Sequence, residues 1–272
     1  MQVAAVLKHP AARNTRGLKQ NTAMFNIATV QKPAAQALSQ DGLSLLSPVD
    51  LTATLKLSPN WAQAWDELAK TWHKLPPDAH LKDGGGYRQR RHTCFVQDLT
   101  SNVLTQTPHR AHWQPTDYNA LHGGFERWFE PIEPAIAQAQ AWTELLAGFG
   151  RLFAQVQAVD KWFVEAHQFR IDTAGGVGRP TPEGAHRDGV NFVVVMLVER
   201  HGVKGGETRV FDAHGPQGVR FVMREPLTAL LLDDARVIHE TTPIFPNHAA
   251  GQQGFRDTLV LTYRANGFQA KP

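Results

Sequence analysis

The chain has 272 residues, of which 42% are hydrophobic and 19% charged, a composition that fits a globular protein and excludes wholesale disorder. Its formal net charge is only +3 and its basic residues are mostly scattered, which argues against a nucleic-acid-binding surface. A single cysteine, Cys94, excludes an intrachain disulfide, and no stretch approaches the roughly 18 apolar residues of a membrane span. We therefore expect a cytoplasmic protein that binds neither nucleic acid nor membrane.

Helical patterns occupy the N-terminal half. Residues 31–46 predict a short helix that ends near Gly42. A second helix is expected over residues 58–75, with Ser58 as its N-cap and Pro59 at its first helical position. Apolar residues at helical spacing give this helix one face that is more typical of a core than of a ligand site: Trp61, Trp65, Leu68, Trp72 and Leu75.

The longest helical pattern covers residues 131–159. Gly148 and Gly150 lie inside it and are expected to interrupt or loosen the helix. The segment before it, residues 107–125, is rich in His, Pro, Trp and Gly and predicts a loop.

A basic segment, residues 88–92 (Arg-Gln-Arg-Arg-His), overlaps a possible strand over residues 90–99. It has two interpretations. The segment is either a solvated edge or a site that attracts an anionic ligand, and we favour the solvated edge.

The pattern changes at Lys161, after which short strands separated by Gly- and Pro-bearing turns indicate an antiparallel sandwich or barrel. We expect residues 1–25 to form a flexible tail and residues 26–272 a single, mainly β, α+β domain. Its parts are a mainly helical buttress over residues 26–160 and a strand-built core over residues 161–272. Strands are expected at residues 162–171, 191–198, 207–212, 219–224, 227–232, 235–240 and 258–264.

The most informative stretch is residues 182–192, Pro-Glu-Gly-Ala-His-Arg-Asp-Gly-Val-Asn-Phe. In an extended backbone, residues i and i+2 face the same way, so His186 and Asp188 can converge on one point. Such a pair is how a non-haem Fe(II) site begins. With 13 His and 25 acidic residues, about one such pair arises by chance, so the alternative is a loop histidine beside a solvated aspartate.

His239 is the candidate for a third ligand. About fifty residues separate it from Asp188, enough for about five strand-and-turn units and a return beside the starting strand. Three protein ligands leave three octahedral positions, which 2-oxoglutarate and O2 would fill. Arg256, which opens the last strand, offers a bidentate partner for the far carboxylate of 2-oxoglutarate, and Thr258 shares its face.

These residues resemble the His-x-Asp…His…Arg-x-Ser/Thr arrangement of Fe(II)/2-oxoglutarate-dependent dioxygenases. Three further segments are similar to strand motifs of that superfamily: Gly205-Gly-Glu-Thr, Leu230-Leu-Leu-Asp-Asp and His239-Glu-Thr-Thr-Pro. The resemblance covers about residues 160–265. Within it, residues 167–263 resemble a bacterial group that includes free L-amino-acid (isoleucine-type) hydroxylases. The gap from His239 to Arg256 is longer than in many members, so residues 243–254 are expected to loop out.

The resemblance implies a double-stranded β-helix, or jelly roll, buttressed by the N-terminal helices. It also implies oxidative decarboxylation of 2-oxoglutarate to succinate and CO2, coupled to hydroxylation of a small molecule such as a free amino acid or a derivative. Fe(II), 2-oxoglutarate and O2 are the implied cofactors and co-substrates. His186, Asp188 and His239 would hold the iron, and Arg256 with Thr258 would anchor 2-oxoglutarate.

Contacts to the substrate are less defined. Arg170, which is expected to share a strand face with Gln168, offers a partner for a carboxylate, and Glu207 offers one for an ammonium group. Sheet-surface polar residues are the favoured interpretation of all three. We interpret most other histidines as solvated: His73, His80, His109, His112, His122, His201, His214 and His248.

Two other functions stay open. The first is a jelly-roll protein without catalysis that binds a small ligand, with or without a structural metal. The second is a metalloenzyme of cupin type that does not use 2-oxoglutarate. The sequence does not predict an oligomeric state, because it shows neither a heptad pattern nor a clear apolar strip.

Overall fold

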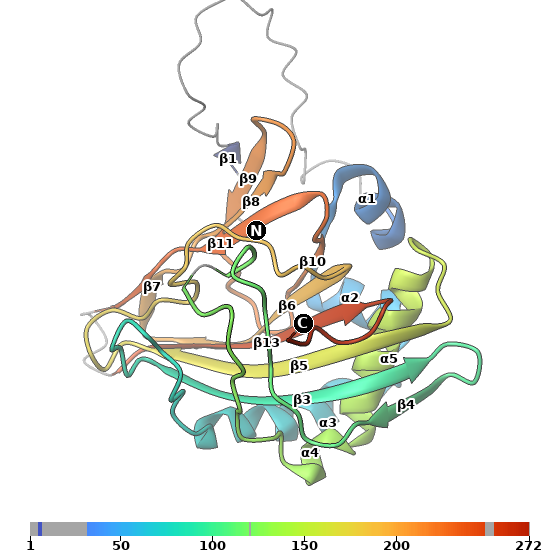
Figure 1. Cartoon of the computed structure of the whole chain (residues 1–272), viewed down its shortest axis with the longest axis horizontal. Coiled ribbons are helices and arrows are strands. Elements are labelled where there is room, and N and C mark those ends of the chain that lie inside the picture. The colour runs from blue at the N-terminus through green and yellow to red at the C-terminus, as the bar shows by residue number, and fades with distance from the viewer. Residues whose placement is uncertain (1–4, 7–31, 120, 248–252, 272) are drawn as a thin grey trace, which may run out of the picture.

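The computed structural model of the chain describes residues 5–6, 32–119, 121–247 and 253–271 (Figure 1). Its helices are α1 (Ala34–Asp41), α2 (Pro48–Leu55), α3 (Trp61–Ala69), the 3-10 helix η1 (Lys70–Lys74), α4 (Pro134–Ala137) and α5 (Gln140–Ala154). Its strands are β1 (Ala5–Val6), β2 (Leu43–Leu46), β3 (Arg88–Asp98), β4 (Val103–Gln106), β5 (Lys161–Asp172), β6 (Phe192–His201), β7 (Val203–Gly205), β8 (Thr208–Asp212), β9 (Gly218–Phe221), β10 (Ala229–Asp233), β11 (Val237–Thr241), β12 (Ile244–Pro246) and β13 (Phe255–Arg264).

Two antiparallel sheets face each other as a jelly roll. The larger sheet has seven strands in the order β2-β10-β6-β13-β5-β3-β4, and the smaller has four in the order β1-β9-β8-β11. A cluster of apolar side chains fills the space between them at one end, where Val193 and Leu197 of β6 contact residues of the smaller sheet such as Val210. The other end is lined by polar side chains and holds the candidate site.

The helices cover the outer face of the larger sheet (Figure 1). Three buried tryptophans form the centre of this layer, with ring centroids 6.1 Å apart for Trp65 and Trp72 and 6.2 Å apart for Trp65 and Trp142. Side chains of this size bury a large apolar area, and we expect them to contribute much of the free energy of folding. This layer makes the sheet a rigid support for the side chains on its other face.

Side chains alternate between these two environments along each strand of the larger sheet. Register places Arg88, Ile171 and Arg256 in one row across β3, β5 and β13. The next row on the same face holds Arg90, Phe169 and Thr258. These rows face the space between the sheets, whereas the intervening residues, such as Ala166 and Leu259, pack against the helices.

The N-terminal half departs from its predicted organisation. Residues 26–160 are not only a helical buttress, because they supply β2, β3 and β4 to the larger sheet. The predicted tail, residues 1–25, lies outside the described residues except for Ala5–Val6, which pair with β9.

Two helix predictions need correction. The helix expected over residues 58–75 begins only at Trp61, whose amide donates to the carbonyl of Ser58, and its last turns tighten into η1. The glycines of α5 do not interrupt it. A Cβ atom on Gly148 would lie 3.0 Å from Leu55, and one on Gly150 would clash with Gln97, so these glycines allow α2 and β3 to approach the helix closely.

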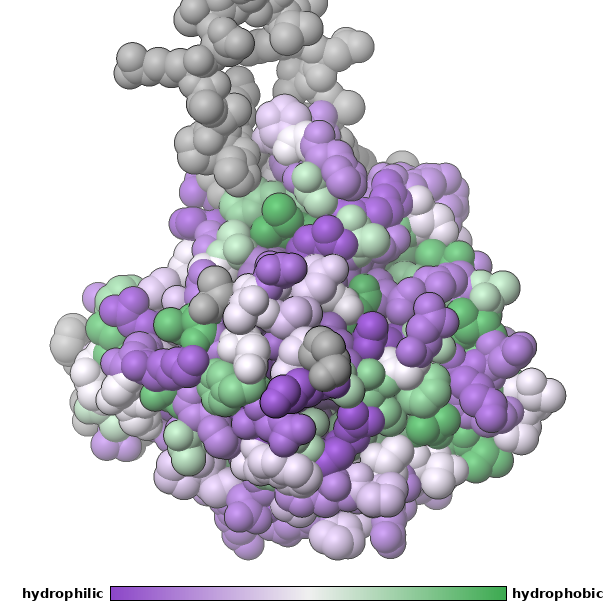
Figure 2. Space-filling model, in the orientation of Figure 1, coloured by the Kyte–Doolittle hydropathy of each residue, from purple (hydrophilic) through white to green (hydrophobic). Residues whose placement is uncertain are grey.

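The surface carries few large exposed apolar side chains. Val49, Val103, Trp128 and Phe245 are exposed, and they lie on separate elements or loops. On the face shown in Figure 2, hydrophilic side chains are interspersed with small groups of hydrophobic ones. Among the described residues, no helix combines the length and the apolar character needed to cross a membrane.

Candidate active site

The candidate iron ligands come together at the polar end of the sandwich. His186 and Asp188 precede β6, and His239 lies in the middle of β11. The backbone amide of each histidine donates to the carbonyl of the other, at 3.0 and 2.9 Å, so the segment around His186 runs antiparallel beside β11. The Nε2 atoms of His186 and His239 lie 3.9 and 3.7 Å from the two carboxylate oxygens of Asp188.

Asp234 shapes the turn that carries Asp188. Its carboxylate accepts hydrogen bonds from the amides of Asp188, Gly189 and Val190, at 2.9, 2.7 and 3.1 Å. Burial and the nearby Asp188 raise the pKa of Asp234 to about 6. The sequence indicated this residue only as part of a strand motif, and its bonding role depends on a contact between segments 46 residues apart.

The protonation of the two imidazoles leaves lone pairs for a metal. Nδ1 of His186 donates to the carbonyl of Gly184 at 2.9 Å, so its Nε2 is unprotonated in the neutral ring. Burial disfavours the charged form of His186, but Asp188 and Glu183 outweigh it and raise its pKa. Burial and His186 lower the pKa of His239, so that ring stays neutral. With His186 deprotonated by a bound metal, two imidazoles and a carboxylate would fit the facial ligand set of non-haem Fe(II).

A cavity of about 120 Å³ extends from these ligands to Arg256. The Arg256 side chain is 2% exposed, and within the described part of the chain its buried Nε and Nη2 atoms have no hydrogen-bond partner. Burial and the nearby Arg200 lower its pKa to about 10, so it remains charged at neutral pH. Thr258 lines the same cavity, and its carbonyl accepts from the indole of Trp72 at 3.2 Å. A buried guanidinium with unused donors fits a carboxylate ligand.

Another wall of the cavity comes from β3 and from the loop before α4. From sequence, an anion-attracting site at residues 88–92 was only the less favoured interpretation, and the loop was not assigned to the site. The segment of residues 88–92 is not a solvated edge, because Arg88, Arg90 and His92 are buried. His112 and His122, interpreted from sequence as solvated, are buried as well. This end of β3 pairs with β5 on one side, and on the other the amides of Arg90 and His92 donate to the carbonyls of Pro76 and Glu130, a placement that its charged composition conceals.

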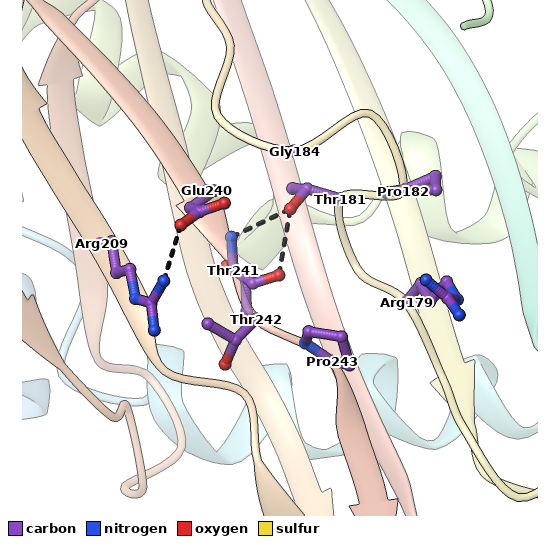
Figure 3. Close-up of a pocket in the computed structure, with 9 residues that line it drawn as sticks. All are labelled: Arg179, Thr181, Pro182, Gly184, Arg209, Glu240, Thr241, Thr242 and Pro243. Carbon is purple, nitrogen blue, oxygen red and sulfur yellow. Dashed lines mark hydrogen bonds and ion pairs between the residues drawn. The ribbon is translucent and has the colours of Figure 1, made fainter. Parts of the chain in front are cut away.

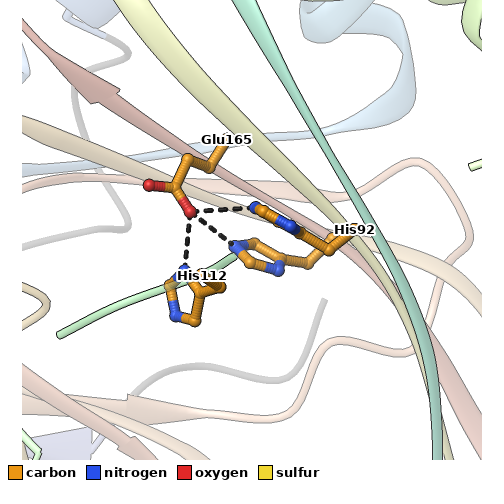
Figure 4. Close-up of side chains that lie close together, drawn as sticks. His92, His112 and Glu165 are labelled. Atoms are coloured by element: carbon orange, nitrogen blue, oxygen red, sulfur yellow. Dashed lines mark hydrogen bonds and ion pairs between the residues drawn. The ribbon is translucent and has the colours of Figure 1, made fainter. Parts of the chain in front are cut away.

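His112 also belongs to a second cluster with His92, Glu165 and His167 (Figure 4). One oxygen of Glu165 accepts from Nε2 of His92 at 2.9 Å and from Nδ1 of His112 at 2.6 Å. Arg90 donates to Nδ1 of His167 at 2.6 Å, so the proton of that ring is on Nε2, which lies 3.9 Å from Glu165. The ring protons therefore point toward the carboxylate. A metal would need lone pairs there, and the cluster is better described as a hydrogen-bond network.

The substrate contacts suggested by sequence lie elsewhere. Gln168 and Arg170 face the helices, where Gln168 donates to Thr71 and Arg170 forms a bidentate pair with Asp257 at 2.8 and 2.6 Å. Glu207 is paired with Arg209 at 2.8 Å. None of the three lines the cavity.

A larger hollow of about 260 Å³ lies beside the cavity (Figure 3). It shares Thr181 and Thr241 with the cavity, and Arg209 is paired with Glu240 at 3.1 Å on its wall. None of the three candidate iron ligands lines it, so we place the candidate active site in the smaller cavity.

Comparison with known proteins agrees with this fold. A family model described as 2OG-Fe dioxygenase matches residues 69–262. The crystal structure of a bsmA homolog (Mpe_A2762) from Methylobium petroleophilum PM1 is 55% identical, with a TM-score of 0.83 over 88% of this chain and 94% of that one. No match was found among curated proteins.

Two more distant structures share the fold. IDO from Bacillus thuringiensis is 16% identical, with a TM-score of 0.70 over 86% of this chain and 98% of that one. The Fe(II)/(alpha)ketoglutarate-dependent dioxygenase TqaL is 19% identical, with a TM-score of 0.63 over 85% of each chain.

The chain belongs to the 2OG-Fe dioxygenase family. It is a 2-oxoglutarate-dependent dioxygenase, and members of its family use Fe(II), 2-oxoglutarate and O2.

Proposed function

We propose that this dioxygenase hydroxylates a small molecule, a free amino acid or a close derivative. One observation carries the proposal: a single cavity is lined by a two-histidine, one-carboxylate cluster and by a buried guanidinium, that of Arg256, whose Nε and Nη2 have no partner among the described residues. A cavity of about 120 Å³ favours a small substrate over a folded one. The resemblance to amino-acid hydroxylases supports the substrate class.

Each candidate residue has a defined task in this proposal. His186, Asp188 and His239 bind Fe(II) through Nε2, a carboxylate oxygen and Nε2, and leave the remaining positions open. The iron, when bound, supplies the activation of O2. Arg256 binds the far carboxylate of 2-oxoglutarate, and Thr258 adds a hydroxyl donor beside it.

The protein also controls protons and water around these groups. Gln114 donates to the carboxylate of Asp188 at 3.1 Å and so limits rotation of that ligand. Gly184 fixes the tautomer of His186. The buried position of Arg256 excludes competing water, which strengthens its interaction with a carboxylate.

An anaerobic titration with Fe(II) and then 2-oxoglutarate tests the ligand assignments through the visible metal-to-ligand charge-transfer band. We expect a band in the wild type, no band in His239→Ala, and about 10- to 100-fold weaker binding of 2-oxoglutarate in Arg256→Met. Arg151→Met, on the exposed side of α5, is the control and should match the wild type. A normal band in His239→Ala would refute the ligand set.

A screen of free amino acids for succinate release then tests the substrate class. At least one should accelerate succinate release by the protein that shows the band. If none does, the amino-acid part of the proposal is wrong. Metal binding without any response to 2-oxoglutarate would instead favour a metalloenzyme of cupin type.

A further inference from the structure

Three arginines line the wall of the cavity that β3 and the loop before α4 form. The Arg88, Arg90 and Arg127 side chains are only 6%, 3% and 2% exposed. Each has a buried nitrogen without a hydrogen-bond partner among the described residues, namely Nη2 of Arg88, Nε of Arg90 and Nε of Arg127. An unpaired donor on a buried cation is costly, so the arrangement favours an anionic ligand beside these guanidinium groups.

Carboxylates balance part of this positive charge, including Asp78, which lies 3.9 Å from Nη1 of Arg90. Four arginines line the cavity, including Arg256, against the carboxylates of Glu183 and Asp188. Asp78 lies behind the wall, where it accepts from Nε of Arg88 at 2.7 Å. The Arg90 guanidinium lies 3.7 and 4.4 Å from the centroids of Phe129 and Phe169, which hold it in place without neutralising it.

This wall is distinct from the guanidinium that we assign to 2-oxoglutarate. Arg88 and Arg256 occupy one row of the sheet on either side of β5, so their backbones are about 10 Å apart. The wall also reaches the candidate iron site. Nη2 of Arg127 donates to Gln114 at 2.8 Å, and Gln114 donates to Asp188 at 3.1 Å.

His112 adds a hydrogen-bond acceptor beside the arginines. Its Nδ1 proton points to Glu165, so the lone pair is on Nε2, on the far side of the ring (Figure 4). In the part of the chain that is described, no partner contacts this Nε2, and His112 lines the cavity. Burial lowers the pKa of His112 to about 4, so the ring remains a neutral acceptor at physiological pH.

We infer that Arg88, Arg90 and Arg127 recognise a carboxylate of the substrate and that Nε2 of His112 accepts from an N–H or O–H group next to it. The ligand class is a small carboxylic acid with a neighbouring amino or hydroxyl group. The inference rests on the proposed function and adds to it the residues that select the substrate.

Matched ligands test the site. Binding of the common L-amino acids, their primary amides and the corresponding decarboxylated amines is measured by calorimetry, anaerobically with Fe(II) and 2-oxoglutarate and again without both. We expect at least one amino acid to bind, and its amide and its amine to bind at least about tenfold more weakly. Equal binding of acid and amide, or no binding of any acid, would overturn the inference.

Variants locate the site. Arg127→Met should weaken binding of the acid at least about tenfold. Arg91→Met is the matched control, because Arg91 lies on the same stretch of β3 as the wall but faces away from the cavity and donates to Pro131. It should bind the acid as the wild type does. Arg127→Lys, which keeps the buried charge but loses the planar fork, replaces Arg127→Met if that variant does not fold, and should also bind more weakly.

The charge-transfer band separates this inference from the proposed function. Arg127→Met, which loses a contact behind Gln114 but no direct ligand, should still show the band and should bind 2-oxoglutarate at least about tenfold more tightly than Arg256→Met does. If Arg127→Met weakens the binding of 2-oxoglutarate as much as Arg256→Met does, the three arginines bind the co-substrate and the inference is wrong. If the wild type shows no band but binds the acid through Arg127, the carboxylate site stands and the proposed function fails.

Discussion

Two clusters of histidine and carboxylate lie between the sheets, and they differ in where the protons are. In both, the ligand atoms lie within 4.8 Å of one another. In the first, of His186, Asp188 and His239, a backbone carbonyl accepts a hydrogen bond from Nδ1 of His186, so Nε2 of the neutral ring is unprotonated. In the second, around Glu165, the ring protons themselves point at the carboxylate.

The difference teaches that proximity of ligand types does not define a metal site. Where a group lies behind a ring, it decides the tautomer, and the tautomer decides whether a lone pair or a proton faces the centre. Arg90 donates to Nδ1 of His167 and so places the ring proton on Nε2. The carbonyl of Gly184 accepts from Nδ1 of His186 and so leaves Nε2 unprotonated.

The largest expected effect separates the clusters by iron content. The wild type should bind one Fe(II) per chain, and His186→Ala should bind it at least about 100-fold more weakly, because a direct ligand is lost. His92→Gln should still bind one Fe(II) per chain. Iron per chain is counted by mass spectrometry after anaerobic gel filtration. Two irons per chain in the wild type, or a loss of iron in His92→Gln, would show that the cluster around Glu165 also binds metal.

A smaller effect is expected on stability in acid. His112 in the unfolded chain takes up a proton near its ordinary pKa of about 6.5, but burial in the folded protein lowers the pKa to about 4. The unfolded state therefore binds more protons between these values, and stability falls as pH falls. His112→Gln keeps a donor for Glu165 and removes the titration.

Chemical denaturation at pH 7 and pH 5 measures this effect. The loss of unfolding free energy between the two should be smaller in His112→Gln than in the wild type by about 2 kcal/mol. The exposed histidine variant His214→Gln is the control. An equal loss in His112→Gln and the wild type would show that His112 is not held neutral.

The smallest expected effect concerns the carbonyl that fixes His186. Gly184 has φ of 79°, and a Cβ atom there would meet nothing within 4 Å, so Gly184→Ala should cost only the backbone strain of about 1 kcal/mol. Gly176→Ala is matched in backbone, with φ of 93° and the same open space. Both variants should lose a similar free energy of unfolding, but only Gly184→Ala should weaken the binding of Fe(II), by less than about tenfold. Equal Fe(II) affinity in the two variants would show that Gly184 does not contribute to iron binding.

Much of the C-terminal half could be predicted from the sequence. The alternation and turn signals after Lys161 predicted the main strands, because Gly- or Pro-bearing segments separate most of them. The spacing of His186 and Asp188, with His239 in a later strand, identified residues that the fold brings within 4 Å. Arg256 stood out as a charge in an apolar strand, and it is buried in the cavity.

The substrate side of the cavity could not be predicted, because it depends on which residues of a strand face which layer. Gln168 and His167 are neighbours in β5, yet one faces the helices and the other the cavity. That choice follows from the pairing of β5 with β3 and β13. The buried state of Arg88 and Arg90 follows from the loop that covers them. No local sequence pattern encodes the pairing of β5 or the position of this loop.

The alternation along β3 also limits how this segment can change in evolution or in the laboratory. Substitutions at positions 88 and 90 alter the chemistry of the cavity and leave the helix layer in place. Deletion of one residue before the strand would instead exchange the two faces, setting Arg88 and Arg90 against the helices and tryptophans. We therefore expect libraries that vary side chains here to yield folded proteins with new ligand preferences, and length variants to yield very few.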